Sequence, residues 1–185
     1  MALAELLLER EATILQRWFD LIADTYPPDT ARFLRQEKDP FLNPVGSSIA
    51  REIKVIFAEL QRGGSTDKLA SALDGIAQIR AVQEFTPGRA LAFIFLLKRA
   101  VRDDLASHLR DGSLWGELLA YESRIDEAAL VAFDIYMRRR EKIHEIRTNE
   151  IRQRSELLLE RLSRIYGGPE REPPDVDRPD STPSN

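Results

Sequence analysis

Hydrophobic residues follow a helical period along most of the chain. Before the first Tyr-Pro pair, at Tyr26, apolar side chains recur every three or four residues, which predicts one amphipathic helix. Its stripe consists of Leu3, Leu6, Leu7, Ile14, Leu15, Trp18, Phe19, Leu21 and Ile22. Later segments repeat this spacing, and none shows the alternation typical of a strand. The pattern therefore predicts an all-α protein.

Proline marks several predicted helix starts. At Asn43-Pro44 the Asn side chain is suited to cap free backbone amides, while proline at the next position removes no needed donor. Thr86-Pro87 repeats this cap-then-proline arrangement. The helix that follows is apolar on nearly every side over residues 91–97, as is typical of a central helix.

The stretch from Leu114 to Tyr166 contains no proline and predicts a helix of about 50 residues. From residue 138 to residue 166, nine Lys and Arg stand against five Glu, on a chain with a net charge of -4, so we expect this part to project into solvent. Spacings of four and three predict a coiled-coil seam there. Its members are Ile151, Ser155, Leu158, Leu162 and Ile165, and Ile143 is assigned to the same dimer and signalling helix.

These shifts in composition predict three parts. Residues 1–140 form a helical body, and residues 141–166 form the projecting helix. Residues 167–185 are rich in proline and carry five Asp and Glu against two Arg, which predicts a disordered acidic tail.

Composition narrows the function classes. The absence of cysteine among 185 residues excludes thiol nucleophiles, thiolate metal sites and disulfides. The apolar run at residues 91–97 is far shorter than the roughly 20 residues needed to cross a bilayer, and no secretory signal is readable. We therefore expect a cytoplasmic protein without a membrane span. The basic part of the last helix, residues 138–166, is interleaved with glutamates and lacks aromatic residues before Tyr166, so we expect no nucleic-acid binding.

Candidate chemistry is sparse. The two histidines, His108 and His144, do not complete a metal site and are not placed to hold a haem. No two groups form a recognisable acid–base or nucleophile arrangement. We therefore predict that the chain is not an enzyme and has neither a metal nor a cofactor.

Four residues are candidates for binding a small ligand. Arg80, Gln83 and Phe85 place a cation, an amide and an aromatic ring at the end of an apolar helix, and Tyr136 adds a hydroxyl. Such groups orient ligands over an apolar floor. The alternative is structural: Arg80 binds terminal carbonyls and Gln83 bridges to the next helix.

Several phrases, in their order, resemble the N-terminal sensory domain of the stressosome RsbT co-antagonists, the RsbRD N-terminal domain family. The resemblance spans roughly residues 3 to 150. The phrases are Trp18-Phe19, Thr25-Tyr26-Pro27, Asn43-Pro44-Val45-Gly46, Ile79-Arg80-Ala81-Val82-Gln83-Glu84-Phe85-Thr86-Pro87, Phe93 through Leu97, and Phe133-Asp134-Ile135-Tyr136 leading into Arg140-Glu141-Lys142.

This resemblance implies a globin-like helical bundle that carries no haem, dimerises and passes a signal along its C-terminal helix. In full-length members that helix leads into a phosphorylatable STAS output domain. Residues 167–185 show no strand pattern of that kind, so we expect the chain either to signal through its last helix or its tail to a separate protein or to act by binding alone.

Three hypotheses remain open from the sequence. The first is a non-enzymatic sensory or regulatory homodimer that perceives a small ligand or a protein partner. The second is a ligand-free adaptor that presents the basic helix and the acidic tail to a partner. The third is a globin with haem or another cofactor, which a visible absorption band would favour.

Overall fold

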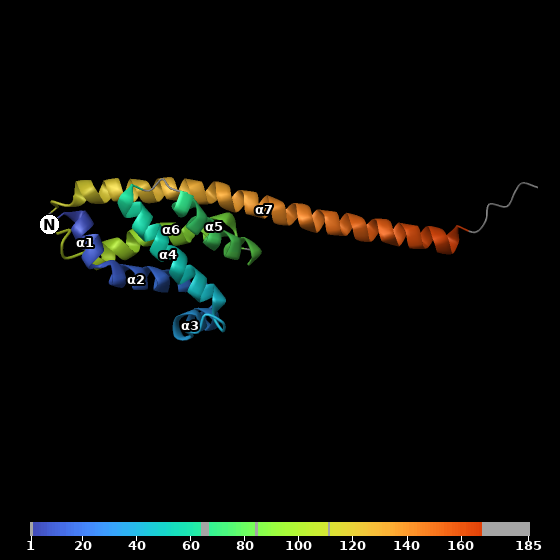
Figure 1. Cartoon of the computed structure of the whole chain (residues 1–185), viewed down its shortest axis with the longest axis horizontal. Helices are drawn as coiled ribbons and strands as arrows, with labels where there is room; N and C mark the ends of the chain where they lie inside the picture. Colours follow the sequence, from blue (N-terminus) through green and yellow to red (C-terminus); the bar gives the residue numbers. More distant parts are fainter. Residues whose placement is uncertain (1, 64–66, 84, 111, 168–185) are drawn as a thin grey trace, which may run out of the picture. The chain divides into compact units, whose positions relative to one another are not determined.

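The computed structural model describes residues 2–63, 67–83, 85–110 and 112–167. Within these ranges every helix or strand assigned is an α-helix (Figure 1). In chain order they are α1 (Leu3–Glu9), α2 (Glu11–Ala23), α3 (Pro28–Gln36), α4 (Pro44–Arg62), α5 (Asp67–Val82), α6 (Pro87–Asp104) and α7 (Trp115–Tyr166). The all-α class and the long C-terminal helix are confirmed. The predicted disordered tail falls, from residue 168 on, outside the described residues.

The single N-terminal helix predicted from the apolar stripe is wrong, because the backbone breaks at Arg10. This residue adopts φ −99° and ψ 8°, and its N–H donates to the carbonyl oxygen of Leu6 at 2.9 Å. Leu6 before the break and Ile14 and Trp18 after it are all buried. The apolar stripe thus predicted the buried face correctly, but it gave no sign that the helix is interrupted.

The predicted cap at Asn43 is confirmed. Its side-chain oxygen accepts from the N–H of Gly46 at 2.8 Å, while its amide nitrogen donates to the carbonyl of Leu34 at 3.2 Å. A side chain at Gly46 would collide with this amide, so the close approach requires glycine. The corresponding expectation at Thr86 is wrong: Thr86 occupies the cap position, but its side chain makes no capping bond.

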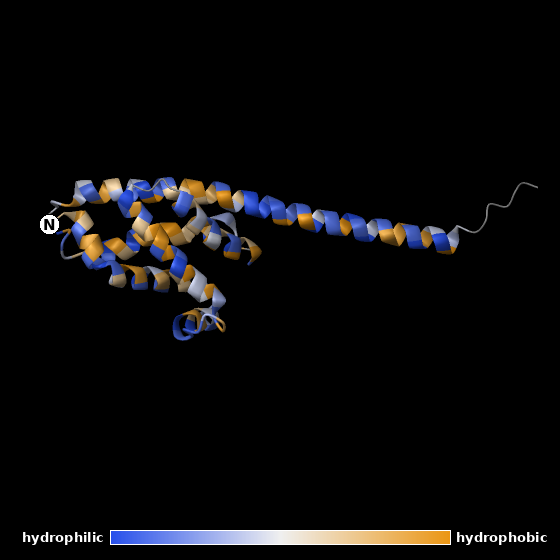
Figure 2. Cartoon of the chain, viewed as in Figure 1, coloured by the Kyte–Doolittle hydropathy of each residue, from blue (hydrophilic) through white to orange (hydrophobic). Residues whose placement is uncertain are grey.

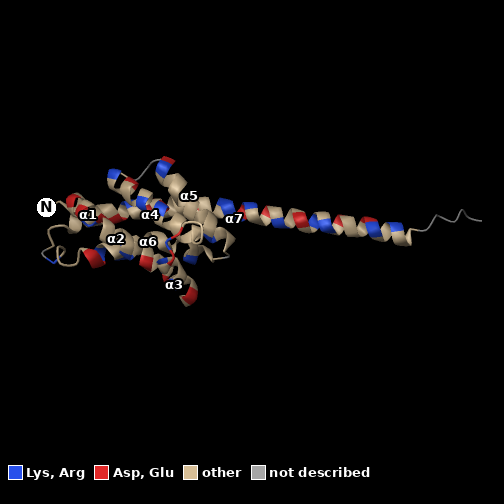
Figure 3. Cartoon of the chain, turned by 60° about the horizontal axis from the view of Figure 1, so that its bottom comes forward, with Lys and Arg blue, Asp and Glu red and all other residues tan. Residues whose placement is uncertain are grey.

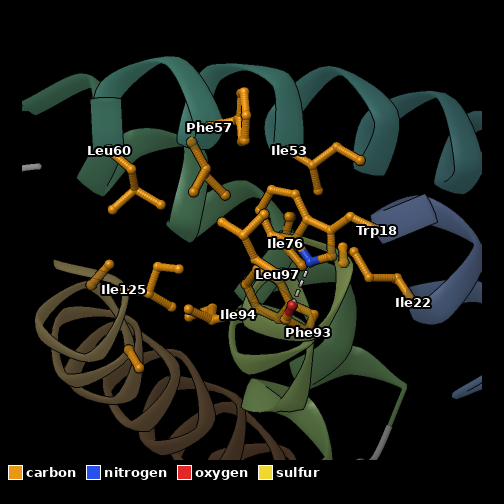
Figure 4. Close-up of a cluster of buried hydrophobic side chains, with 14 of the residues drawn as sticks. Trp18, Ile22, Ile53, Phe57, Leu60, Ile76, Phe93, Ile94, Leu97 and Ile125 are labelled. Atoms are coloured by element: carbon orange, nitrogen blue, oxygen red, sulfur yellow. Dashed lines mark hydrogen bonds between the residues drawn. The ribbon is translucent and has the colours of Figure 1, made fainter. Parts of the chain in front are cut away.

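The core gathers side chains from α2, α4, α5, α6 and α7 (Figure 4). Trp18 lies at its centre, fully buried, and its indole N–H donates to the carbonyl oxygen of Phe93 at 2.6 Å. This bond satisfies the polar atom of a large apolar side chain. Phe95 on α6 is 48% exposed, so the prediction that this helix is covered on nearly every side is wrong at that position.

The chain divides into two compact units, Met1–Ile143 and His144–Asn185. In the second unit the side chains of residues 144–166 are exposed, and they are mostly hydrophilic with interspersed hydrophobic residues, three of them consecutive at Leu157, Leu158 and Leu159 (Figure 2). Ile143, assigned from the sequence to the dimer helix, is half-buried and packs against the core of the first unit. Over the described residues, no helix is both long enough and apolar enough to span a bilayer.

Candidate functional site

A fully buried cation, Arg80, stands in the last turn of α5. Three aromatic rings surround its guanidinium: the centroids of Tyr26, Phe85 and Phe93 lie 5.2, 4.9 and 5.7 Å from Cζ. Removing a charge from water is costly, and aromatic faces offset part of that cost. The sequence therefore places an energetically expensive group at the point where α5 ends.

The hydrogen bonds of Arg80 engage two of its three guanidinium nitrogens. One terminal nitrogen donates to the carbonyl of Arg89 at 3.0 Å, and the other donates to Thr25 Oγ1 at 3.0 Å. Nε is buried without a partner, and within the described ranges no carboxylate forms an ion pair with this guanidinium. Burial lowers the pKa of Arg80, although an arginine remains charged at neutral pH.

Gln83 and Tyr26 close one side of this arrangement. The Tyr26 hydroxyl donates to Gln83 Oε1 at 3.0 Å, and the Tyr26 ring meets the Phe85 ring edge-on with centroids 5.4 Å apart. Burial raises the pKa of Tyr26, an effect that the charge of Arg80 opposes. The connection between α2 and α3 is thereby attached to the end of α5.

Tyr136 attaches α7 to the same place. Its hydroxyl donates to the carbonyl oxygen of Phe85 at 2.6 Å, and Arg140 donates to that oxygen at 3.2 Å. All four candidate residues therefore come together. We call Tyr26, Arg80, Gln83, Phe85 and Tyr136 the Arg80 cluster.

The cluster is packed and hydrogen-bonded internally. A cavity of about 400 Å³ is lined by Tyr26, and another of about 480 Å³ is lined by Gln83. Arg80, Phe85 and Tyr136 line neither of them. The arrangement is thus suited to hold several segments of the chain together, and Tyr26 and Gln83 are the members of the cluster that border these cavities.

A second feature of the first unit, with no local signal in the sequence, is an ion pair between a buried carboxylate and a half-exposed arginine. Glu122 on α7 is only 5% exposed and accepts two hydrogen bonds from Arg102 on α6, at 2.6 and 2.7 Å. The hydrogen bond to Glu122 raises the pKa of Arg102. Arg124, two residues further along α7, donates to the carbonyl of Leu60 at 2.7 Å. No local spacing joins residues 20 positions apart on different helices.

No cluster of three or more His, Asp or Glu able to hold a metal occurs within the described part of the chain. His108 interacts with the adjacent Ser107 hydroxyl at 3.3 Å, and His144 lies exposed at the start of the second unit.

Comparison with known proteins identifies the family. Searches of curated proteins and of solved structures give no match, so the globin-like arrangement of the helices stays a prediction. The sequence model of the RsbT co-antagonist protein rsbRD N-terminal domain matches residues 12–151, most of the chain and all of the Arg80 cluster. The chain therefore belongs to the RsbT co-antagonist protein rsbRD N-terminal domain family.

Proposed function

We propose that this chain is a non-enzymatic sensory and regulatory module of the stressosome type, which pairs as a homodimer and signals to a regulatory protein. Family membership supports the sensory and regulatory role. In this proposal residues 1–140 are the sensor, residues 141–166 transmit the signal, and ligand or partner binding at the sensor is the input.

The observation that carries the proposal is a pair of hydrogen bonds from α7 to one carbonyl oxygen. Tyr136 and Arg140, one turn apart on α7, both donate to the oxygen of Phe85. The ring of Phe85 in turn packs on Arg80 and Tyr26. A displacement anywhere in the cluster therefore acts on α7 through contacts that are already formed, as a two-state sensor requires.

Exposed apolar side chains support pairing. Ile151, Leu158, Leu162 and Ile165 are each about half exposed or more, although they are large and hydrophobic. Their heptad spacing fits knobs-into-holes packing against a second helix of the same kind. Pairing would remove this apolar surface from water.

The test compares two tyrosines on α7. Dimer dissociation constants are measured by sedimentation for the unaltered chain, Tyr136→Phe and Tyr121→Phe. Tyr121 is also fully buried, but its hydroxyl has no hydrogen-bond partner in the described structure. We expect Tyr136→Phe to shift the constant by about fivefold or more and Tyr121→Phe to leave it unchanged. Equal constants for all three would contradict the coupling.

A second candidate is the ligand-free adaptor. It is favoured by one observation: Arg80, Phe85 and Tyr136 line neither of the two adjoining cavities. In that case the cluster is purely structural, and Tyr136→Phe lowers stability without altering dimer dissociation.

A further inference from the structure

A groove between α4 and α5 borders the Arg80 cluster at Gln83. Its volume of about 480 Å³ falls within the range of small-molecule sites. Its lining combines one pair of opposite charges, an amide and three aliphatic side chains. They are Arg51, Glu52 and Val45 from α4, Ile79 and Val82 from α5, and Gln83 directly after α5.

The charged pair in this groove has hydrogen-bonding atoms to spare. Arg51 Nε and one terminal nitrogen of Arg51 both donate to Glu52 Oε1, at 3.0 and 2.7 Å. Among the described residues, nothing binds the other carboxylate oxygen of Glu52 or the other terminal nitrogen of Arg51. The two charges cancel, so the lining has no net charge, but it offers an anionic acceptor beside a cationic donor.

This pair differs from an ordinary surface pair. Acidic and basic residues are spread over the helices of the chain, and a pair of two exposed charges contributes little (Figure 3). The Glu52 side chain, in contrast, is only 15% exposed, while that of Arg51 is 70% exposed. Gly75 lies against it: a β-carbon at this position of α5 would stand 3.1 Å from Glu52 Cγ. Glycine inside a helix is destabilising relative to alanine, so the gain at this position is room for the carboxylate in the wall of the groove.

We infer that this groove binds a free α-amino acid with an aliphatic side chain. The ammonium group of the amino acid donates to the unused oxygen of Glu52, and its carboxylate accepts from the unused nitrogen of Arg51. A zwitterion is neutral overall, as the lining is, so it binds without breaking the internal pair. The aliphatic side chain of the ligand packs on Val45, Ile79 and Val82, of which Val82 is 64% exposed in the unliganded chain.

This inference rests on the proposed sensory function, for which it names a ligand class. Gln83 belongs both to the groove and to the Arg80 cluster. Its Oε1 accepts from Tyr26, while its amide nitrogen has no acceptor among the described residues. That nitrogen offers a further donor for the carboxylate of the amino acid. A bound amino acid therefore contacts the cluster whose member Tyr136 attaches α7.

Isothermal titration calorimetry on the full chain tests the ligand class, with leucine as the probe. Isocaproate has the same carbon skeleton but lacks the ammonium group, and leucinamide lacks the carboxylate. We expect leucine to bind at least about tenfold more tightly than either compound, because each of them loses one charge-assisted interaction. Equal affinities for the three compounds, or no heat of binding up to about 10 mM leucine, would overturn the inference.

Two pairs of variants locate the site. Glu52→Gln removes the acceptor of the ammonium group and should weaken leucine binding about tenfold or more. Its matched control, Asp103→Asn, removes one negative charge from an exposed pair on α6 and should leave binding unchanged. Val82→Ser removes an exposed apolar contact without disturbing the core and should weaken binding several-fold, whereas Val131→Ser, at an exposed position of α7, should not. Equal losses within either pair would overturn the inference.

The oligomeric state is measured separately by sedimentation. A monomer that binds leucine overturns the proposed pairing and keeps this site. A dimer that does not bind leucine overturns this site and keeps the pairing.

Discussion

Tyr121 and Tyr136 lie on the same helix and are both fully buried, yet their hydroxyls differ in bonding. Tyr136 donates to the carbonyl of Phe85 at 2.6 Å, whereas the Tyr121 hydroxyl finds no acceptor in the described ranges. Burial raises the pKa of Tyr121, so this phenol stays neutral. The contrast provides an internal control for what the Tyr136 bond contributes.

The first prediction concerns stability. Tyr136→Phe should lower the free energy of unfolding by about 1 kcal/mol, because it leaves a carbonyl without its shortest hydrogen bond. Tyr121→Phe should be neutral or slightly stabilising, since it removes an unsatisfied buried hydroxyl. Urea unfolding of both variants measures the difference. A larger loss for Tyr121→Phe would show that its hydroxyl has an unrecognised partner.

The second prediction concerns the buried cation. Arg80→Ala should cost about 3 kcal/mol, because it opens a cavity among Tyr26, Phe85 and Phe93 and frees the Thr25 hydroxyl. Arg80→Met should cost clearly less, since it keeps the packed stem and removes the desolvated charge. Thermal and urea unfolding report both values. Equal losses for Met and Ala would mean that the charge itself is required.

The third prediction concerns the ion pair between α6 and α7. Arg102 is about half exposed, so in Glu122→Gln water hydrates its guanidinium. Glu122 is buried, so in Arg102→Met its carboxylate loses its hydrogen-bond donors while it stays out of water. Arg102→Met should therefore destabilise more than Glu122→Gln does, the former by about 3 kcal/mol. A double-mutant cycle gives the coupling energy. Strict additivity of the two substitutions would contradict a direct interaction.

The fourth prediction is a pH dependence at Asp74. The pKa of this carboxyl is lowered in the folded chain by the bond from Arg139, so the pair stabilises above the unfolded pKa of about 3.9 and is lost as pH falls through the folded value. Both side chains are at least a third exposed, so the effect is below about 1 kcal/mol. Asp74→Asn should be less stable than the unaltered chain at pH 7, and the difference should shrink as the pH falls below the unfolded pKa of about 3.9. A difference that persists in acid would assign the effect to packing.

Local features were predictable from sequence, and pairings between helices were not. The Asn43 cap depends on residues three positions apart, and its prediction was correct. Arg80, Gln83 and Phe85 are close in sequence, so their proximity was also expected.

The partners of these residues come from elsewhere in the chain. Tyr26, which bonds to Gln83, and Arg102, which binds Glu122, are brought in by helix packing, which leaves no local spacing signal. The break at Arg10 was missed for a related reason: the apolar period describes which face is buried and is insensitive to one non-helical residue.

The fifth prediction uses two neighbouring leucines of the second unit. Leu158 is 58% exposed and lies in the predicted seam, whereas Leu157 is 56% exposed and lies outside it. Leu158→Lys should weaken the dimer about tenfold or more, since it places a charge in the apolar interface. Leu157→Lys adds the same charge at equal exposure and should leave dissociation unchanged. Sedimentation velocity over a concentration series measures both. Equal dissociation constants for the two variants would contradict the assignment of Leu158 to the dimer interface.

Native mass spectrometry of the gently purified full chain tests the central claim most directly, because one spectrum reports the number of subunits and any retained molecule. We expect the mass of two chains for the unaltered protein and for Leu157→Lys, and the mass of one chain for Leu158→Lys. A single-chain mass for the unaltered protein at micromolar concentration would contradict the paired-helix mechanism.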